Sequence, residues 1–123
     1  MSGATDPSAL VDRWRDTYND DVARMVSDCY APDCTVYPMG LSPIEGQDML
    51  LRVEQAVLKK APRRRMRVDR RHVCGNVICV EAVLLDPDQG GEWSLPFAAV
   101  LSIVDGRIAT DRTYADWQRW PGL

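Results

Sequence analysis

The sequence predicts an α+β domain in which helices come first and an antiparallel sheet follows. Up to residue 60, apolar residues recur every three or four positions, which is the spacing of one helix face. After residue 65 they alternate at every second position, and short turn sequences separate the runs. Helices followed by a series of strands predict helices packed on one face of a sheet.

Three helices account for the first half of the chain. The first begins at Asp6-Pro7, because an acid is a good N-cap and proline suits the first helical position. The segment 19–21 ends it and caps the second, and a third begins at Glu45-Gly46 and stops before Pro62. Their apolar stripes are Leu10, Val11, Trp14 and Tyr18; Val22, Met25, Val26 and Cys29; and Met49, Leu50, Val53, Ala56 and Val57.

Five strands are predicted. A short one spans residues 34–37, ends at Pro38, and is followed by a loop over 39–44. The others are Arg65–Cys74, Val77–Leu85, Glu92–Val104 and Arg107–Ala115. Gly75-Asn76 and Asp105-Gly106 are hairpin turns, and the second is the stronger signal. Pro96 lies inside the longest strand, which predicts a sheet edge or a bulge there.

Length and composition exclude several classes of protein. With 123 residues, 46% hydrophobic and 27% charged, the chain suits one globular domain, residues 1–123. Its net charge of −3 argues against nucleic acid as the main partner. No apolar run approaches the roughly 18 residues of a membrane span, and no secretion signal is visible. We therefore expect a cytoplasmic protein with neither nucleic acid nor membrane as partner.

The chain has four cysteines and one histidine. No pair of cysteines has the C-x-x-C spacing of zinc or redox sites. We expect no metal, and four reduced thiols that behave as small buried hydrophobes.

Glu81 is a carboxylate in the middle of an otherwise apolar strand face. A two-residue turn at Gly75-Asn76 places Arg70 opposite Glu81. The same register pairs Cys74 with Val77, His72 with Cys79, Val68 with Val83, and Met66 with Leu85. Two interpretations stay open: Arg70 simply neutralises Glu81, or this face lines a pocket in which Arg70 orients an ionised Glu81.

Two motifs carry a family resemblance. The first runs from Tyr30-Ala31-Pro32-Asp33-Cys34-Thr35-Val36 to Gly46-Gln47-Asp48 at a helix entry. The second is Asp105-Gly106-Arg107-Ile108, continuing through Arg112-Thr113-Tyr114-Ala115-Asp116. In this order the chain resembles the SnoaL-like branch of the nuclear-transport-factor-like superfamily. The resemblance implies a cone-shaped α+β barrel, in which three N-terminal helices pack on a strongly curved, mostly antiparallel sheet around an apolar cavity.

The resemblance also implies a range of activities, most of them without a cofactor. Members include polyketide cyclases, ketosteroid isomerases, epoxide-hydrolase-like enzymes, dehydratases and noncatalytic binding modules. The positions that carry the three catalytic residues of ketosteroid isomerases fall here at Pro38, Trp14 and Ala98 or Ala99. We therefore do not expect steroid isomerisation by the mechanism of those enzymes. Of the epoxide-hydrolase pattern, only Glu81 supplies a comparable acid.

The polyketide cyclases rely on an acid near the last strand, for which Asp111 and Asp116 are the candidates. Alternation puts Asp111 on the face of Thr113, which corresponds to the cavity face in the epoxide-hydrolase pattern. We therefore favour Asp111, and expect Asp116 to be structural.

These observations predict a small enzyme that needs no cofactor. It would bind an apolar polyketide- or terpenoid-like molecule and use acid–base chemistry for cyclisation, isomerisation, dehydration or epoxide opening. The predicted catalytic residues are Glu81, Arg70 and Asp111. The predicted substrate contacts are Trp14, Tyr18, Tyr37, His72, Cys79, Trp93 and Thr113. Trp117 and Trp120 would cover the cavity mouth or a dimer partner.

We also expect a homodimer. The alternative function is a noncatalytic ligand-binding or dimerisation module of the same fold. An enzyme should enclose a pocket of roughly several hundred Å³ with the carboxylates at its wall. A noncatalytic module should instead show Glu81 and Arg70 paired on a surface with no cavity beside them.

Overall fold

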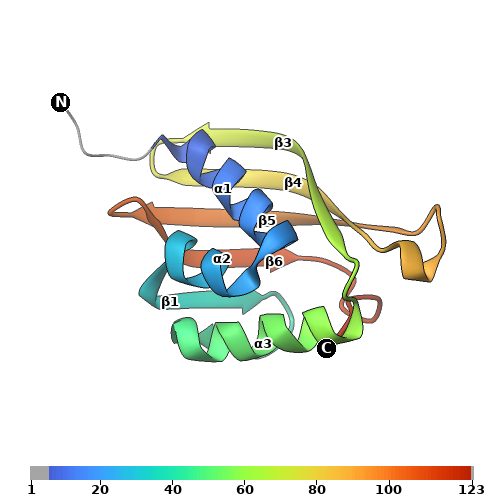
Figure 1. Ribbon diagram of the computed structural model, residues 1–123. Helices are drawn as coiled ribbons and strands as arrows, with labels where there is room; N and C mark the ends of the chain where they lie inside the picture. The colour runs from blue at the N-terminus through green and yellow to red at the C-terminus, as the bar shows by residue number, and fades with distance from the viewer. Residues whose placement is uncertain (1–5, 123) are drawn as a thin grey trace.

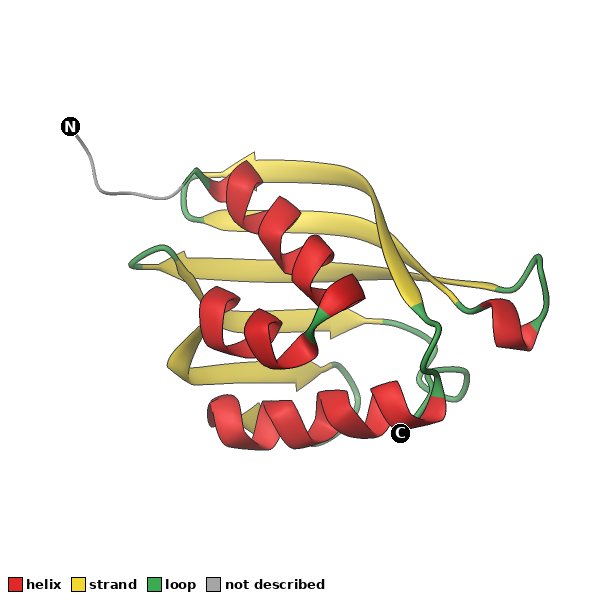
Figure 2. Ribbon diagram, viewed as in Figure 1, coloured by secondary structure: helices red, strands yellow, loops and turns green. Residues whose placement is uncertain are grey.

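The computed structural model of the protein describes residues 6–122, which form three α-helices on one side of a six-stranded sheet (Figure 1). The elements are α1 (Pro7–Asp20), α2 (Val22–Cys29), β1 (Tyr30–Pro38), β2 (Ile44–Glu45), α3 (Gly46–Lys60), β3 (Arg65–Cys74), β4 (Val77–Leu85), η1 (Pro87–Gln89), β5 (Ser94–Val104) and β6 (Arg107–Tyr114). This is the predicted α+β class, with the helices in one layer and the strands in the other (Figure 2).

The helices begin where the sequence predicts. The Asp6 side chain accepts a hydrogen bond from the backbone N–H of Ser8 at 3.0 Å and caps α1. Asp21 caps α2 in the same way, by accepting from the N–H groups of Ala23 and Arg24. The two helices therefore join through a single acidic residue and pack against each other.

The sheet is mixed and open. Its strand order is β2-β1-β6-β5-β4-β3, with β1 parallel to β6 and every other pair antiparallel. The prediction of a mostly antiparallel sheet is confirmed, but within residues 6–122 the sheet does not close into a barrel, because β2 and β3 are not paired with each other. Strand β1 begins at Tyr30 and not at residue 34, since the backbone is already extended there (φ −105°, ψ 145°).

Pro96 occupies a local edge, as its residue type requires. Strand β5 is central, and Pro96 pairs with Val83 of β4 on one side. On the other side, the pairing with β6 starts only at Ala98, which lies opposite Tyr114. The missing N–H of Pro96 therefore interrupts no ladder.

The hairpin of β3 and β4 confirms only part of the predicted register. Arg70 pairs with Glu81, and the pairs nearer the turn also match. A shift between Val68 and Arg70 then moves the remaining residues by one position, so that Met66 pairs with Leu84. The predictions of Val68 opposite Val83 and Met66 opposite Leu85 are therefore wrong. The shift turns Met66 toward the helices, where it is buried in the core.

The face of the sheet toward the helices forms the core. Every second residue of β4 and β5 on this face is buried: Ile78, Val80, Ala82, Leu84, Leu95, Phe97, Ala99 and Leu101. The alternate residues face the other way. Most of them, among them Glu81, are partly buried or exposed, and Val83 is the buried exception in β4. The fold therefore assigns each strand residue either to the helix side or to the outer side of the sheet.

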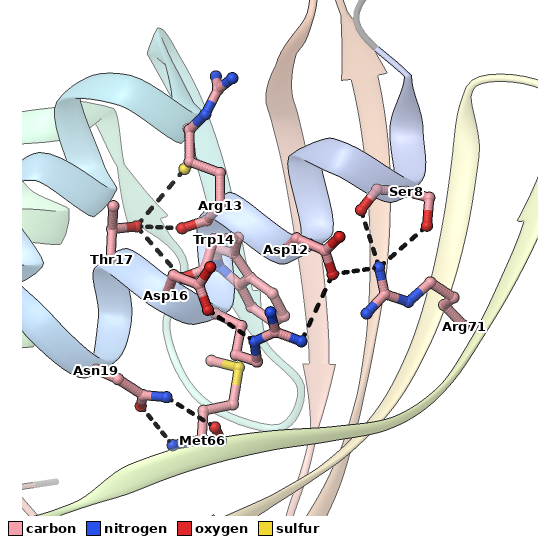
Figure 3. A network of polar contacts seen from close by, with 11 residues as sticks. Ser8, Asp12, Arg13, Trp14, Asp16, Thr17, Asn19, Met66 and Arg71 are labelled. Carbon is pink, nitrogen blue, oxygen red and sulfur yellow. Dashed lines mark hydrogen bonds and ion pairs between the residues drawn. The ribbon is translucent and has the colours of Figure 1, made fainter.

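Polar contacts fix α1 against β3 (Figure 3). The Arg71 guanidinium donates to the carbonyl and hydroxyl oxygens of Ser8 at 2.9 and 3.1 Å and pairs with Asp12 at 2.8 Å. In the last turn of the helix, the Asn19 side chain donates to the carbonyl of Met66 at 2.9 Å and accepts from its N–H at 2.7 Å. Two points of attachment hold the inward-facing side chains of α1 at a defined place above the sheet.

The four cysteines are free thiols. Cys29 and Cys34 are buried, as predicted, whereas Cys79 is partly exposed and Cys74 exposed. Across residues 6–122, no three His, Cys, Asp or Glu side chains gather as a metal ion would need. None of the helices described here is both long and apolar enough to cross a membrane.

Candidate functional site

A cavity lies between the helices and the inner face of the sheet. The cavity volume is about 70 Å³, which is less than the volume we expected for the pocket of an enzyme. Most of the wall is apolar or aromatic. The lining residues are Trp14, Tyr18, Met25, Tyr30, Val36, Pro38, Ile44, Leu50, Val53, Glu54, Val57, Met66, Phe97, Asp111, Thr113, Trp117 and Trp120.

Asp111 is the acid that β6 presents to this cavity. Its Cα pairs with Val36 of β1 and Leu101 of β5, so it shares the inner face with core residues. The residue is 3% exposed. Its Oδ2 accepts a hydrogen bond from the Tyr30 hydroxyl at 2.7 Å, and its Oδ1 accepts one from the Thr113 hydroxyl at 2.7 Å. A buried carboxyl with two donors is held in one orientation.

A tryptophan extends this arrangement to the first helix. The Nε1–H of Trp14 donates to the hydroxyl oxygen of Tyr30 at 3.1 Å. Tyr30 is the residue at which α2 ends and β1 begins. The chain of donors from Trp14 through Tyr30 to Asp111 therefore joins α1, β1 and β6, and every hydrogen bond in it points toward the carboxyl group.

Burial controls the protonation of this group. It raises the pKa of Asp111 above its ordinary value, while the hydrogen bonds from Thr113 and Tyr30 act in the opposite direction. Burial and the neighbouring Asp111 hold the pKa of Tyr30 well above its usual range. Tyr30 thus stays a neutral donor, and Asp111 titrates closer to neutral pH than a surface aspartate does.

A second carboxyl faces the cavity from α3. Burial is the largest cause that raises the pKa of Glu54, to about 7. The positive charge of Arg64 opposes this shift, and the negative charge of Asp111 adds to it. Arg64 is buried, with its Cζ 4.4 Å from the centre of the Tyr18 ring. Its Nη2 donates to the Tyr18 carbonyl oxygen at 3.2 Å. Glu54, Tyr18 and Arg64 form a polar group that is distinct from the Tyr30–Asp111–Thr113 cluster.

Aromatic residues of the C-terminal segment complete the wall. The Trp120 ring meets Phe97 edge to face, with 5.2 Å between centroids, and lies 5.2 Å from Trp117. The Nε1–H of Trp117 donates to the carbonyl of Met39 at 2.8 Å. Trp117 and Trp120 both line the cavity, and the hydrogen bond of Trp117 attaches this segment to the residue after β1.

Four of the predicted site residues come together in the cavity: Trp14, Tyr18, Asp111 and Thr113. Glu81 does not join them, because its strand position points to the outer side of the sheet. There it pairs with Arg70 at 3.6 Å and with the Nε2 of His72 at 2.7 Å. The hydrogen bond with His72 is the largest cause that lowers the pKa of Glu81, so this carboxylate is ionised.

The remaining predicted contacts also lie outside the cavity lining. Cys79 is opposite His72 on the outer face. Tyr37 lies under the guanidinium of Arg112, and Trp93 lies under that of Arg119. Asp116 accepts from the backbone N–H of Gln118 at 3.2 Å, which is the structural role we expected.

Sequence reasoning missed two polar residues of the cavity wall, Tyr30 and Glu54. Tyr30 belongs to the first family motif, which indicated a turn and a strand but no role for this side chain in the cavity. Glu54 carried a usable signal, since it lies four residues after Leu50 and three before Val57, both buried on α3. An acid within a helical apolar stripe calls for the same explanation as an acid within a strand face.

The chain belongs to the family of the SnoaL-like domain, whose family model matches residues 11–110. No curated protein matches the sequence. The cone-shaped α+β fold expected from the resemblance is therefore the fold of this chain.

Solved structures share this fold at low sequence identity. A protein from Jannaschia sp. CCS1 described as a SnoaL-like polyketide cyclase is 17% identical, with TM-score 0.79 over 95% of this chain and 93% of that one. IdmH from Streptomyces antibioticus, described as a polyketide cyclase, is 16% identical, with TM-score 0.81 over 94% and 96%. A SnoaL-like family protein from Agrobacterium tumefaciens strain C58, described as an isomerase, is 20% identical, with TM-score 0.75 over 89% and 96%.

Proposed function

We propose that the protein is a cofactor-independent enzyme that uses Asp111 as acid and base on an apolar small molecule. The observation that carries the proposal is the position of Asp111: buried at a largely apolar cavity wall and fixed by Tyr30 and Thr113. The polyketide cyclase descriptions of two related folds favour a polyketide-like substrate, and a terpenoid-like substrate stays the alternative.

In the proposed reaction a single carboxyl group removes a proton from the ligand and later returns it. Ionised Asp111 takes a proton from an acidic C–H bond of the ligand, and the electron pair of that bond stays on the ligand as an enolate. The carboxylic acid then returns the proton to another atom of the ligand, which completes an isomerisation or follows a ring closure and restores the carboxylate. The hydroxyl groups of Tyr30 and Thr113 stabilise the ionised form between turnovers.

Deuterium exchange tests this proposal without knowledge of the natural substrate. A small cyclic ketone such as 2-indanone is incubated with the protein in D₂O, and loss of its α-proton signal is followed by NMR. We expect the wild-type protein to exceed buffer exchange and Asp111→Asn to fall toward the buffer rate, since a general base contributes roughly 10²–10⁴-fold. Glu81→Gln is the matched control, as its carboxylate lies outside the cavity. Equal rates for wild type and Asp111→Asn would rule out this base.

A noncatalytic ligand-binding module is the second candidate function. The small cavity volume favours it, because a ligand of polyketide size fits only if lining side chains move aside. The exposed Glu81–Arg70 pair outside the cavity lining is also the arrangement expected of such a module. Ligand binding with no exchange above buffer would support this alternative. The expected homodimer stays a prediction, which sedimentation equilibrium can check.

A further inference from the structure

Two polar groups in the cavity wall form no hydrogen bond among residues 6–122. The hydroxyl group of Tyr18 is buried and makes no hydrogen bond to any residue between 6 and 122. The carboxyl group of Glu54 faces the same cavity, and its residue is partly buried. Buried polar groups without partners are rare and costly, so the Tyr18 hydroxyl calls for an explanation.

The two groups are neighbours from different helices. Tyr18 lies in the last turn of α1 and Glu54 in the middle of α3, and both side chains line the same cavity. Burial is the largest cause that raises the pKa of the Tyr18 hydroxyl, and the negative charge of Glu54 adds to it. Tyr18 is 4% exposed and its ring is held by Arg64 on one side. Neither group takes part in the hydrogen-bonded chain that ends at Asp111.

We propose that Tyr18 and Glu54 form a ligand-binding subsite for a hydroxyl group carried by an otherwise apolar molecule. A ligand hydroxyl accepts a hydrogen bond from the Tyr18 O–H and donates its own proton to a carboxyl oxygen of Glu54. It would satisfy both unpartnered groups at once. The subsite deepens the proposed function, on which it rests for the choice of an apolar ligand, and gives that ligand a direction relative to Asp111.

The charges around the subsite favour a neutral oxygen over an ion. An anion would meet the two carboxyl groups of Glu54 and Asp111 inside a cavity of low polarity. A cation would lie close to Arg64, which is already buried and has an Nε without a partner. A neutral hydroxyl group avoids both kinds of charge repulsion. It can donate its proton to a carboxyl oxygen of Glu54 whether Glu54 is ionised or protonated.

Paired probes test the proposal: p-cresol and toluene share one ring and one methyl group, and only p-cresol carries the hydroxyl. Dissociation constants are measured by NMR titration of the labelled protein. We expect p-cresol to bind about tenfold more tightly than toluene. Tyr18→Phe and Glu54→Leu should each reduce this ratio severalfold, while toluene binding changes little. Tyr37→Phe, which removes a hydroxyl outside the cavity, should keep the full ratio.

Several outcomes would overturn the subsite. These are no detectable p-cresol binding, equal binding of the two probes to the wild type, or an unchanged ratio in both Tyr18→Phe and Glu54→Leu. Tighter binding of 4-methylbenzylamine than of p-cresol would assign the subsite to a cation instead. The thermal midpoint of each variant is recorded as well; because the Tyr18 hydroxyl has no partner, Tyr18→Phe should fold with wild-type stability.

The subsite and the proposed function can fail separately. Asp111→Asn should keep the preference for p-cresol, because Tyr18 and Glu54 remain in place. A preserved preference together with wild-type proton exchange in Asp111→Asn refutes the catalytic role of Asp111 and leaves the subsite standing. Lost preference in Tyr18→Phe with proton exchange that depends on Asp111 supports both.

Discussion

The Tyr30 hydroxyl donates a hydrogen bond to the Asp111 carboxyl group at 2.7 Å, although 81 positions separate the two residues in the sequence. The contact exists because β1 runs parallel to β6 as its sheet neighbour, which places the start of one strand beside the other. It joins the end of α2 to the carboxyl group that we propose for proton transfer. The geometry of this pair therefore bears on both stability and function.

Removal of the Tyr30 hydroxyl should destabilise the fold. Tyr30→Phe leaves Oδ2 of the buried Asp111 without its donor, and we expect the free energy of unfolding to fall by about 1–3 kcal/mol, measured by urea denaturation. The pKa of Asp111 should rise further, because the lost hydrogen bond favoured its ionised form. Tyr37→Phe is the matched control and should change stability by less than about 0.5 kcal/mol. Equal losses in the two variants would contradict the importance of this bond.

Glu54 should make the protein less stable as pH rises. Its pKa is about 7 in the folded protein against an ordinary value of 4.5, so the folded state binds the proton more tightly. The contribution of the protonated Glu54 to stability is fully present below the unfolded-state pKa. It is lost as the pH rises through the folded-state pKa, and the free energy of unfolding falls by about 3 kcal/mol. The raised pKa of Asp111 adds a change of the same sign.

Urea denaturation at about pH 5 and about pH 8 measures this dependence. Glu54→Gln should flatten it, since glutamine cannot ionise. Glu81→Gln serves as the control, because the pKa of Glu81 is lowered and any contribution from it has the opposite sign. An identical pH dependence in wild type and Glu54→Gln would show that Glu54 is not held protonated.

Glu81→Gln distinguishes the two assignments of the catalytic carboxylate. The sequence favours Glu81, whereas the cavity contains Asp111. From the position of Glu81 beside His72 and Arg70 on the outer side of the sheet, we expect this variant to keep its activity and its ligand binding. Measured turnover or proton exchange provides the check. Abolished exchange in Glu81→Gln with wild-type exchange in Asp111→Asn would restore the sequence-based assignment.

Gly122 should be required for the C-terminal segment to pack on α3. A Cβ atom at this position would come within 2.9 Å of the Val57 Cα, and the φ angle of +80° is strained for any other residue. We expect Gly122→Ala to lower the free energy of unfolding by about 1–3 kcal/mol and to weaken ligand binding, since Trp117 and Trp120 precede it. Gly91→Ala, with open space around its Cβ, should be nearly neutral. Denaturation and NMR titration of both variants check this.

Local rules predicted much of the fold. The Asp6 and Asp21 caps, and the positive φ of Asp105 and Gly106 in the last hairpin, depend on residues close in sequence. Alternation likewise put Asp111 and Thr113 on the same face. The shift in β3 was not predictable in this way, because it depends on whether Met66 finds room in a core that distant segments build.

Within the site, the sequence alone determined that Glu81 occupies an apolar strand face with Arg70 opposite it, and that Asp111 shares a face with Thr113. The tertiary structure decided which face is enclosed. Helices cover only one side of the sheet, so Asp111 is buried with Tyr30 while Glu81 stays at the outer surface with His72. Period-two alternation sorts residues into two faces, but only packing of the helices makes one of those faces the inside.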